Sequence, residues 1–225
     1  MSEAILNQAF STVGKEYGYD SVSAEMAEFK DFKLKWRRSC GWIEFTVSDY
    51  LKNAPQEIIE GIARIIFSRI SGSGSKEYPK NMEEWLTNYE FAKANRPTYL
   101  RRSRNLTGSA KGKCRDLTES YNRLVEQGII PPMEDIVFSW TKDPNIRRVG
   151  YCSVLMRVIA ISSVFDTESI PEFVLDFIVY HEMLHMMRGF DPLGKLHDAE
   201  FQADESKYPM KAESEEWLRR LKLYL

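Results

Sequence analysis

The segment 172–188, EFVLDFIVYHEMLHMMR, constrains the fold more than any other part of this 225-residue chain. Residues 173–180 are apolar on nearly every side, which is typical of a helix buried in the centre of a domain. Pro171 suits the first turn of such a helix, and Ser169 can cap it with the glutamate three residues later as its partner. Gly189 is suited to end it. We therefore predict a central buried helix here.

All three histidines of the chain lie near the end of this segment or just beyond it. His181, Glu182 and His185 fit the motif HExxH, in which two imidazoles one helical turn apart bind a single zinc ion. Zinc lowers the pKa of its bound water, the glutamate takes the proton, and the hydroxide attacks a carbonyl that the metal polarises. The motif thus predicts Zn²⁺ as cofactor, Glu182 as catalytic base and a zinc metallopeptidase that hydrolyses peptide bonds.

A catalytic zinc ion needs a third protein ligand and one open position. His197 follows a loop that contains Gly189, Pro192 and Gly194 and can turn the chain back towards the motif. Glu200, one helical turn further, is the alternative third ligand, or else a carboxylate that accepts a hydrogen bond from a ligand. The motif as a whole has a simpler explanation, a chance match with histidines that belong to the core or the surface.

Other polar residues near the motif have expected roles of their own. Asp198 is expected to cap a short helix after His197, and Asp204 to be a solvated charge. Three tyrosines are possible donors to an oxyanion, although a packed core position is the more common state of such residues: Tyr151, Tyr180 and Tyr208.

Hydrophobic periodicity divides the rest of the chain into short elements. Before residue 110 it predicts a helix over 1–20, strands over 32–37 and 42–47 paired across Ser39–Gly41, and helices over 55–70 and 81–95, the last stopped by Pro97. After it come a helix over 114–128, strand-prone runs at 136–140, 149–153 and 158–162, and a terminal helix over 217–225. We expect a subdomain boundary near Lys111, between residues 1–110 and 111–225.

A basic stretch precedes that boundary. Between residues 93 and 115 the chain has eight lysines and arginines and no acidic residue: Lys93, Arg96, Arg101, Arg102, Arg104, Lys111, Lys113 and Arg115. Such a stretch can follow a phosphate backbone, and Tyr99 within it can stack on a base. Lys33, Lys35, Arg37 and Arg38 would extend this surface if the first strand lay nearby. The stretch predicts single-stranded DNA as a partner, and its alternative is a solvated linker between subdomains.

The overall composition bounds the remaining possibilities. The formal net charge is −2, so any nucleic-acid surface must be local. Cys40, Cys114 and Cys152 are far apart and form no CxxC pair, which disfavours disulfides and an all-cysteine zinc site. The amino terminus lacks the features of a signal peptide, and no apolar run reaches the length of a membrane span. We therefore expect a cytoplasmic protein without a membrane partner.

The order of several motifs resembles that of a known family. SWTK at Ser139, GYC at Gly150, IAIS at Ile159, IPEFVLDFIVYHEMLH and HDAEF at His197 resemble the SprT-like metallopeptidase domain, which includes the Spartan proteases. In that family a histidine that opens an HGxEF-like motif follows HExxH. The resemblance, over residues 115–210, implies that His181, His185 and His197 bind zinc and that Glu182 is the base.

The resemblance also implies a fold, which is α+β. A zincin-like domain would place a small antiparallel sheet beside the HExxH helix, after a mostly helical amino-terminal subdomain, and an edge of the sheet would bind the protein or peptide substrate as an added strand. It further implies action on proteins crosslinked to DNA, in the manner of DNA repair.

Two features of the sequence argue against action on proteins crosslinked to DNA. The three cysteines cannot form the zinc ribbon of some relatives, and few residues follow Trp217. Minigluzincins, in which a glutamate is the third ligand and terminal segments keep the enzyme latent, are a related possibility. The alternative of another class is a DNA- or protein-binding module whose metal site is structural or inactive.

Overall fold

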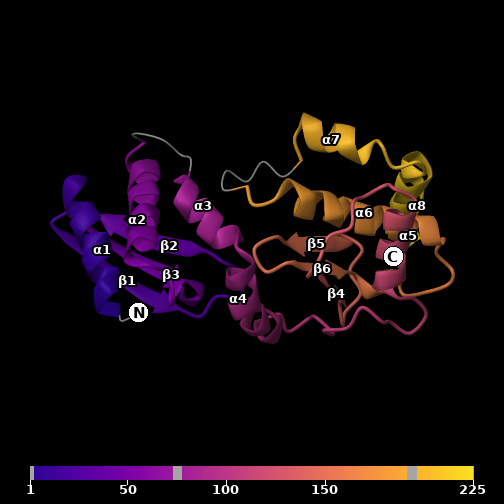
Figure 1. Cartoon of the computed structure of the whole chain (residues 1–225), viewed down its shortest axis with the longest axis horizontal. Helices are drawn as coiled ribbons and strands as arrows, with labels where there is room; N and C mark the ends of the chain where they lie inside the picture. Colours follow the sequence, from indigo (N-terminus) through magenta and orange to yellow (C-terminus); the bar gives the residue numbers. More distant parts are fainter. Residues whose placement is uncertain (1–2, 73–77, 192–196, 225) are drawn as a thin grey trace. The chain divides into compact units, whose positions relative to one another are not determined.

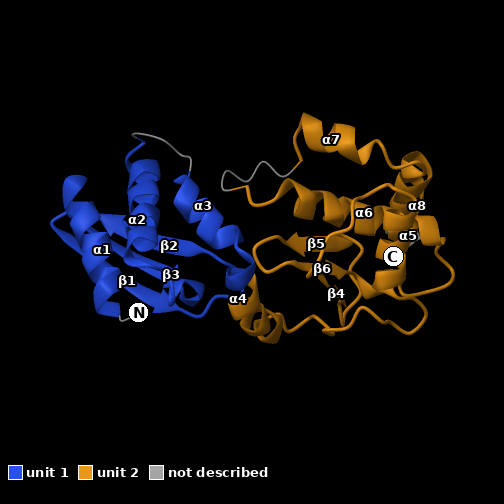
Figure 2. Cartoon of the chain, in the orientation of Figure 1, with its two compact units in different colours: residues 1–91 blue, residues 92–225 orange. Residues whose placement is uncertain are grey.

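The computed structural model describes residues 3–72, 78–191 and 197–224, and the fold is α+β. The chain divides into two compact units, residues 1–91 and 92–225 (Figure 2). This division lies earlier in the chain than the expected boundary near Lys111. Residues 103–110, which we expected in the first unit, make hydrogen bonds with the second unit and belong to it. Thr107 N–H donates to the Trp140 carbonyl (2.9 Å), and Lys142 N–H donates to the Asn105 carbonyl (2.8 Å).

The first unit is a three-stranded sheet with helices (Figure 1). Its elements are α1 (Glu3–Glu16), β1 (Ser21–Ala27), β2 (Leu34–Ser39), β3 (Trp42–Ser48), the 3₁₀ turn η1 (Asp49–Leu51), α2 (Gln56–Ser71) and α3 (Lys80–Thr87). The strand order is β1-β3-β2, with β1 parallel and β2 antiparallel to β3. The expected pairing of β2 with β3 is confirmed, whereas β1 was not expected.

One face of this sheet forms the core of the first unit. Alternate residues of β3, namely Ile43, Phe45 and Val47, are buried. The Phe45 ring packs against Phe10 of α1 (4.7 Å between centroids) and Phe67 of α2 (5.1 Å). The alternation of apolar and basic residues over 32–37 predicts a half-buried strand, and this is wrong: β2, at the edge of the sheet, is exposed over most of its length.

The helix expected over 81–95 is instead two helices, α3 and α4 (Tyr89–Arg102). The break lies at Asn88, whose backbone is extended (φ −62°, ψ 141°) and whose side-chain oxygen accepts from Glu90 N–H (2.9 Å). Pro97 lies inside α4 rather than at its end. A proline removes one backbone donor from a helix, and here the surrounding turns remain helical. Asn81 and Glu84 have the spacing of a capping pair, but Asn81 lies inside α3, which Pro79 precedes without a side-chain cap.

Within its described residues, the second unit contains a three-stranded mixed sheet and, after α4, four helices. Its elements are α5 (Leu117–Glu126), β4 (Val137–Trp140), β5 (Gly150–Ser153), β6 (Val158–Ile161), the 3₁₀ turn η2 (Ser163–Phe165), α6 (Glu172–Arg188), α7 (Ala199–Glu205) and α8 (Lys211–Tyr224). The order is β4-β6-β5. The prediction of an antiparallel sheet is wrong for one pair, because β6 enters between the other two strands and runs parallel to β4.

Helix α6 is the centre of the second unit, as predicted. It packs on β5 and β6 and is surrounded by α5, α7 and α8 (Figure 1). Gly189 ends it with a positive φ of 79°, and its N–H donates to the His185 carbonyl (3.2 Å). The predicted cap at Ser169 is wrong: Pro171 directly precedes the helix, and no side chain caps it. Ser169 N–H instead donates to the Thr167 hydroxyl (3.2 Å).

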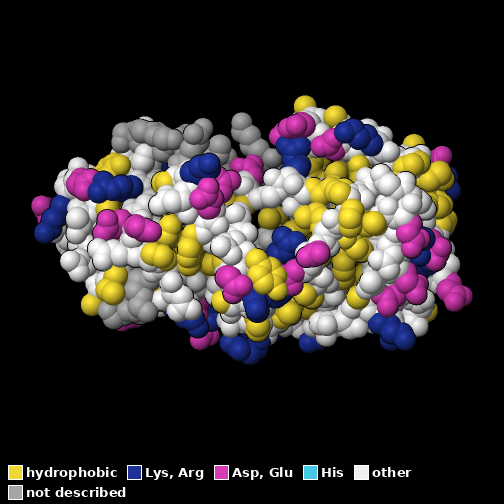
Figure 3. Space-filling model, viewed as in Figure 1, with side chains coloured by type: hydrophobic (Ala, Val, Ile, Leu, Met, Phe, Trp, Pro, Cys, Tyr) yellow, Lys and Arg dark blue, Asp and Glu magenta, His cyan; other side chains and the backbone are white. Residues whose placement is uncertain are grey.

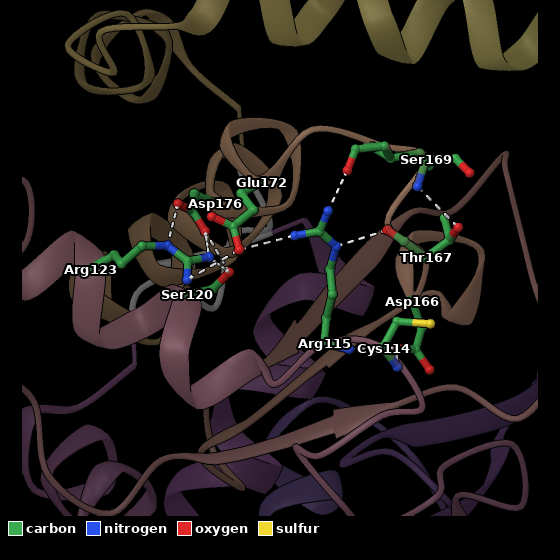
Figure 4. A network of polar contacts seen from close by, with 10 residues as sticks. Cys114, Arg115, Ser120, Arg123, Asp166, Thr167, Ser169, Glu172 and Asp176 are labelled. Atoms are coloured by element: carbon green, nitrogen blue, oxygen red, sulfur yellow. Dashed lines mark hydrogen bonds and ion pairs between the residues drawn. The ribbon is translucent and has the colours of Figure 1, made fainter.

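A buried polar cluster joins α5 to α6 (Figure 4). Asp176 of α6 accepts hydrogen bonds from the Ser120 hydroxyl (2.5 Å) and from the Arg123 guanidinium (2.7 and 2.9 Å). Arg115 donates to the carbonyls of Thr167 (2.8 Å) and Ile170 (2.5 Å), just before α6 begins. These contacts fix α6 at its amino-terminal end, away from the histidines.

Among the helices that the structure describes, none has the length and apolar character needed to cross a membrane. The three cysteines are free thiols, with Cys40 and Cys114 exposed and Cys152 partly buried on β5.

Candidate metal centre

The three histidines come together at the end of α6. His197 Nε2 lies 3.2 Å from His181 Nε2 and 3.1 Å from His185 Nε2. The helical spacing of four residues aligns His181 and His185 on one face, and the chain after α6 brings His197 to them. Together they form a group that could hold a metal ion. Pro192 and Gly194, to which we assigned the turn of this chain, lie outside the described residues.

The protonation state and the spacing of these nitrogens are those of metal ligands. Burial lowers the pKa of His185 to about 4, with His181 and His197 adding to the effect, and burial also lowers the pKa of His197. Both rings are therefore neutral near pH 7, the state in which imidazole binds metals. Ligands about 2.0–2.1 Å from a tetrahedral zinc ion are about 3.3 Å apart, close to the two separations between His197 Nε2 and its neighbours.

Glu182 follows His181 on α6, and its side chain lies against strand β5. The residue is 4% exposed, and burial raises the pKa of its carboxyl group to about 7, an effect that His181 and Arg148 oppose. Gly150 at the start of β5 is in close contact: a Cβ there would lie 2.6 Å from Glu182 Oε1. Arg148 precedes this strand, with its guanidinium over the Tyr151 ring (4.4 Å). The glutamate is thus buried next to the ligand pair, beside β5.

Asp198 and Phe201 fix the position of His197. Both oxygens of Asp198 accept from Arg188 Nη2 (3.0 and 2.9 Å), which ties the residue after His197 to the end of α6. Asp198 also accepts from Phe201 N–H (2.8 Å), so its predicted role as the cap of α7 is confirmed. The Phe201 ring lies 4.6–5.1 Å from all three imidazole rings.

The two glutamates of α7 differ in position. Glu200 is 80% exposed, and its carboxylate lies 3.4 Å from Arg188 Nη2. The metal-binding group of the described residues does not include it. Glu205, which we did not predict, contacts His181 Nδ1 through Oε1 (2.6 Å), and the hydrogen bond to His181 lowers its pKa to about 2. Its spacing of four from Phe201 could have placed it on the inner face of α7.

The tyrosines have mostly structural partners. Tyr180 donates its hydroxyl proton to the Asp204 carbonyl (2.7 Å), and Tyr208 donates to the Phe173 carbonyl (2.8 Å). Burial raises the pKa of both phenols. Asp204 itself pairs with Lys207 (2.7 Å), so it is not simply solvated. Tyr180 and Tyr208 are therefore packed residues rather than oxyanion donors.

An open hollow of about 480 Å³ adjoins the histidines. His181, His197 and Phe201 form one part of its wall, and the rest consists of polar residues from α7 and α8: Gln202, Glu205, Ser206, Lys211 and Glu215. The hollow therefore reaches His181 and His197 from the side of α7 and α8.

The basic stretch is only partly available for a ligand. Arg96 is 12% exposed and pairs with Asp135 (2.6 Å), and Arg115 is 11% exposed and pairs with Glu172 (3.3 Å). Tyr99 is 1% exposed, so the prediction that it stacks on a base is wrong: it belongs to the core. Arg101, Arg104, Lys111 and Lys113 are exposed, and Arg102 is half-buried. Acidic and basic side chains are interspersed on the face drawn in Figure 3.

Comparisons of the chain with protein-family models, with curated proteins and with solved structures found no match. The resemblance to the SprT-like domain therefore remains a prediction from the motifs quoted above.

Proposed function

We propose that this chain is a zinc-dependent endopeptidase of the SprT-like type. The observation that supports the proposal most is that the Nε2 atoms of His181 and His185 lie 3.2 and 3.1 Å from Nε2 of His197, beside a buried glutamate. His181, His185 and His197 would hold the ion. When bound, zinc supplies a Lewis acid that polarises a carbonyl and acidifies a water molecule.

Glu182 is the general base of this proposal. A base works best when its pKa lies near the working pH, and burial brings the pKa of Glu182 to about 7. The carboxylate takes a proton from the attacking water and then delivers it to the amine of the cleaved peptide bond. The contact with Gly150 limits the orientations that the side chain can adopt.

The open side of the cluster argues for catalysis over a structural role. Structural zinc sites are normally closed by four protein ligands, whereas the group among the described residues has three. The adjoining hollow gives a polypeptide access to the histidines. A structural site also has no use for a buried carboxylate beside its first ligand.

Stimulation by single-stranded DNA, and action on DNA-associated or crosslinked proteins, form the second part of the proposal. The exposed cations Arg101, Arg104, Lys111 and Lys113 support it, because such side chains can neutralise phosphates. With Tyr99 buried, the expected contribution is electrostatic, so it falls as salt rises.

The test is a cleavage assay on the purified full-length chain loaded with zinc. An unfolded protein and a DNA-binding protein are each incubated with and without single-stranded DNA. We expect cleavage by the wild type and by Glu200→Gln, and none by Glu182→Gln, which should still bind zinc. Activity that survives in Glu182→Gln would refute the mechanism. Cleavage indifferent to DNA would refute only the second part.

A further inference from the structure

The carboxylate of Glu205 lies between a histidine of the metal centre and a lysine. Its Oε1 is 2.6 Å from His181 Nδ1, and its Oε2 is 2.5 Å from Lys211 Nζ. Glu205 is the last residue of α7, and Lys211 is the first of α8. Their side chains are only 14% and 21% exposed. Two short contacts, one to each oxygen, therefore hold the carboxylate in a single orientation.

This arrangement determines which nitrogen of His181 carries the proton. A carboxylate can only accept, so the proton in the short contact belongs to Nδ1 of the imidazole. In the neutral ring that a metal ion binds, Nε2 then has the free lone pair, and it is this atom that lies 3.2 Å from His197 Nε2. Carboxylates that accept from the second nitrogen of a ligand fix its tautomer and its ring orientation.

We propose that Glu205 is a positioning residue of the metal centre, which holds His181 in the tautomer and orientation that bind the ion, and that Lys211 in turn holds Glu205. This inference rests on the proposed metal site. Glu200, one turn earlier on α7, cannot play this part, since its exposed carboxylate lies beside Arg188.

A simpler role for Glu205 would be to tie α7 to α6 and α8. The two roles predict different effects of a substitution at Glu205 on stability and on metal affinity. A tie between helices contributes to the free energy of unfolding, with little influence on metal affinity in the folded protein. A positioning carboxylate changes metal affinity directly, by 10–100-fold in typical sites.

The experiment compares zinc affinity by competition with a chromophoric chelator, using the full-length wild type, Glu205→Gln, Lys211→Met and the control Glu213→Gln. Glu213 is an exposed residue in the first turn of α8. We expect a zinc Kd higher by about 10–100-fold in Glu205→Gln, a smaller increase in Lys211→Met, and no change in the control. Far-ultraviolet circular dichroism verifies that each variant is folded.

A second measurement is independent of the variants' stability. Long-range proton–nitrogen correlation spectra of the metal-free wild type report the tautomer of each histidine. We expect His181 to carry its proton on Nδ1.

Three outcomes decide the matter. Equal zinc affinity in wild type and Glu205→Gln would overturn the inference and leave the proposed metal site intact. A His181 whose Nε2 carries the proton while Nδ1 carries none, in the metal-free wild type, would do the same. A wild type that binds no zinc would overturn the metal site itself, and the inference with it.

Discussion

A Cβ atom added to Gly150 would lie 2.6 Å from Oε1 of Glu182. The strand β5 and the HExxH motif are thus in such close contact that only glycine leaves room for the carboxylate in its present position. Gly150 is not among the residues with positive φ, so its backbone conformation suits alanine. Its constraint is therefore steric and concerns the position of Glu182.

Gly150→Ala should displace the carboxylate and lower peptidase activity by about 100-fold or more, the range for a lost general base. Zinc affinity should stay unchanged, because the three atoms nearest to the added Cβ all belong to Glu182 and not to a histidine. Gly61→Ala is the matched control, since an added Cβ there would meet Pro79 only at an ordinary 3.9 Å. Full activity in Gly150→Ala would show that Glu182 does not need its present position.

Asp198 should have two separable roles. Asp198→Ala removes both the cap of α7 and the pair with Arg188, and we expect a loss of about 1 kcal/mol in the free energy of unfolding, with weaker zinc binding. Asp198→Asn keeps a capping oxygen and loses the ion pair, so it should retain most of the stability. Thermal unfolding and zinc titration separate the two. If both variants bind zinc like wild type, His197 is held by other contacts.

The buried carboxyl group of Glu182 predicts how stability depends on pH in the metal-free protein. Folding raises its pKa from the ordinary 4.5 to about 7. The folded state therefore keeps a proton that the unfolded state loses, and stability falls as pH rises from about 4.5 to about 7. Glu182→Gln removes this loss.

The variant and wild type should be equally stable near pH 4, and by pH 8 the variant should be more stable by up to about 3 kcal/mol. Denaturant unfolding in the presence of a chelator, at a series of pH values, measures the difference. A difference that does not change with pH would mean that Glu182 is solvated in the folded protein.

The cluster of Asp176, Arg123 and Ser120 should contribute strongly to stability. Asp176→Ala removes the buried carboxylate and leaves the half-buried Arg123 guanidinium without its main partner, and we expect a loss of about 3 kcal/mol. Ser120→Ala removes one hydrogen bond and should cost about 1 kcal/mol. Denaturant unfolding checks both. Equal effects of the two substitutions would show that the ion pair adds little.

Local patterns predicted the elements of the site well. The apolar run 173–180, the spacing of His181 and His185, and the glycine at 189 each depend on neighbours within one or two turns, and the structure has the central helix that they predict. The same holds for the cap at Asp198. Such features need no knowledge of the rest of the fold.

Long-range pairing was harder to predict. The parallel pairing of β4 with β6 depends on which strand occupies the centre of the sheet, and no local pattern specifies that order. Tyr99 was misjudged because its charged neighbours suggested a surface, whereas packing placed its ring in the core. The partner of Glu205 lies 24 residues away in sequence, on another helix.

The most direct test of the account is X-ray absorption spectroscopy at the zinc edge on the loaded protein. We predict three imidazole nitrogens at about 2.0–2.1 Å and one further light atom, and the loss of one imidazole in His197→Ala. A sulfur ligand at about 2.3 Å, or fewer than three imidazoles in the wild type, would contradict the catalytic three-histidine site.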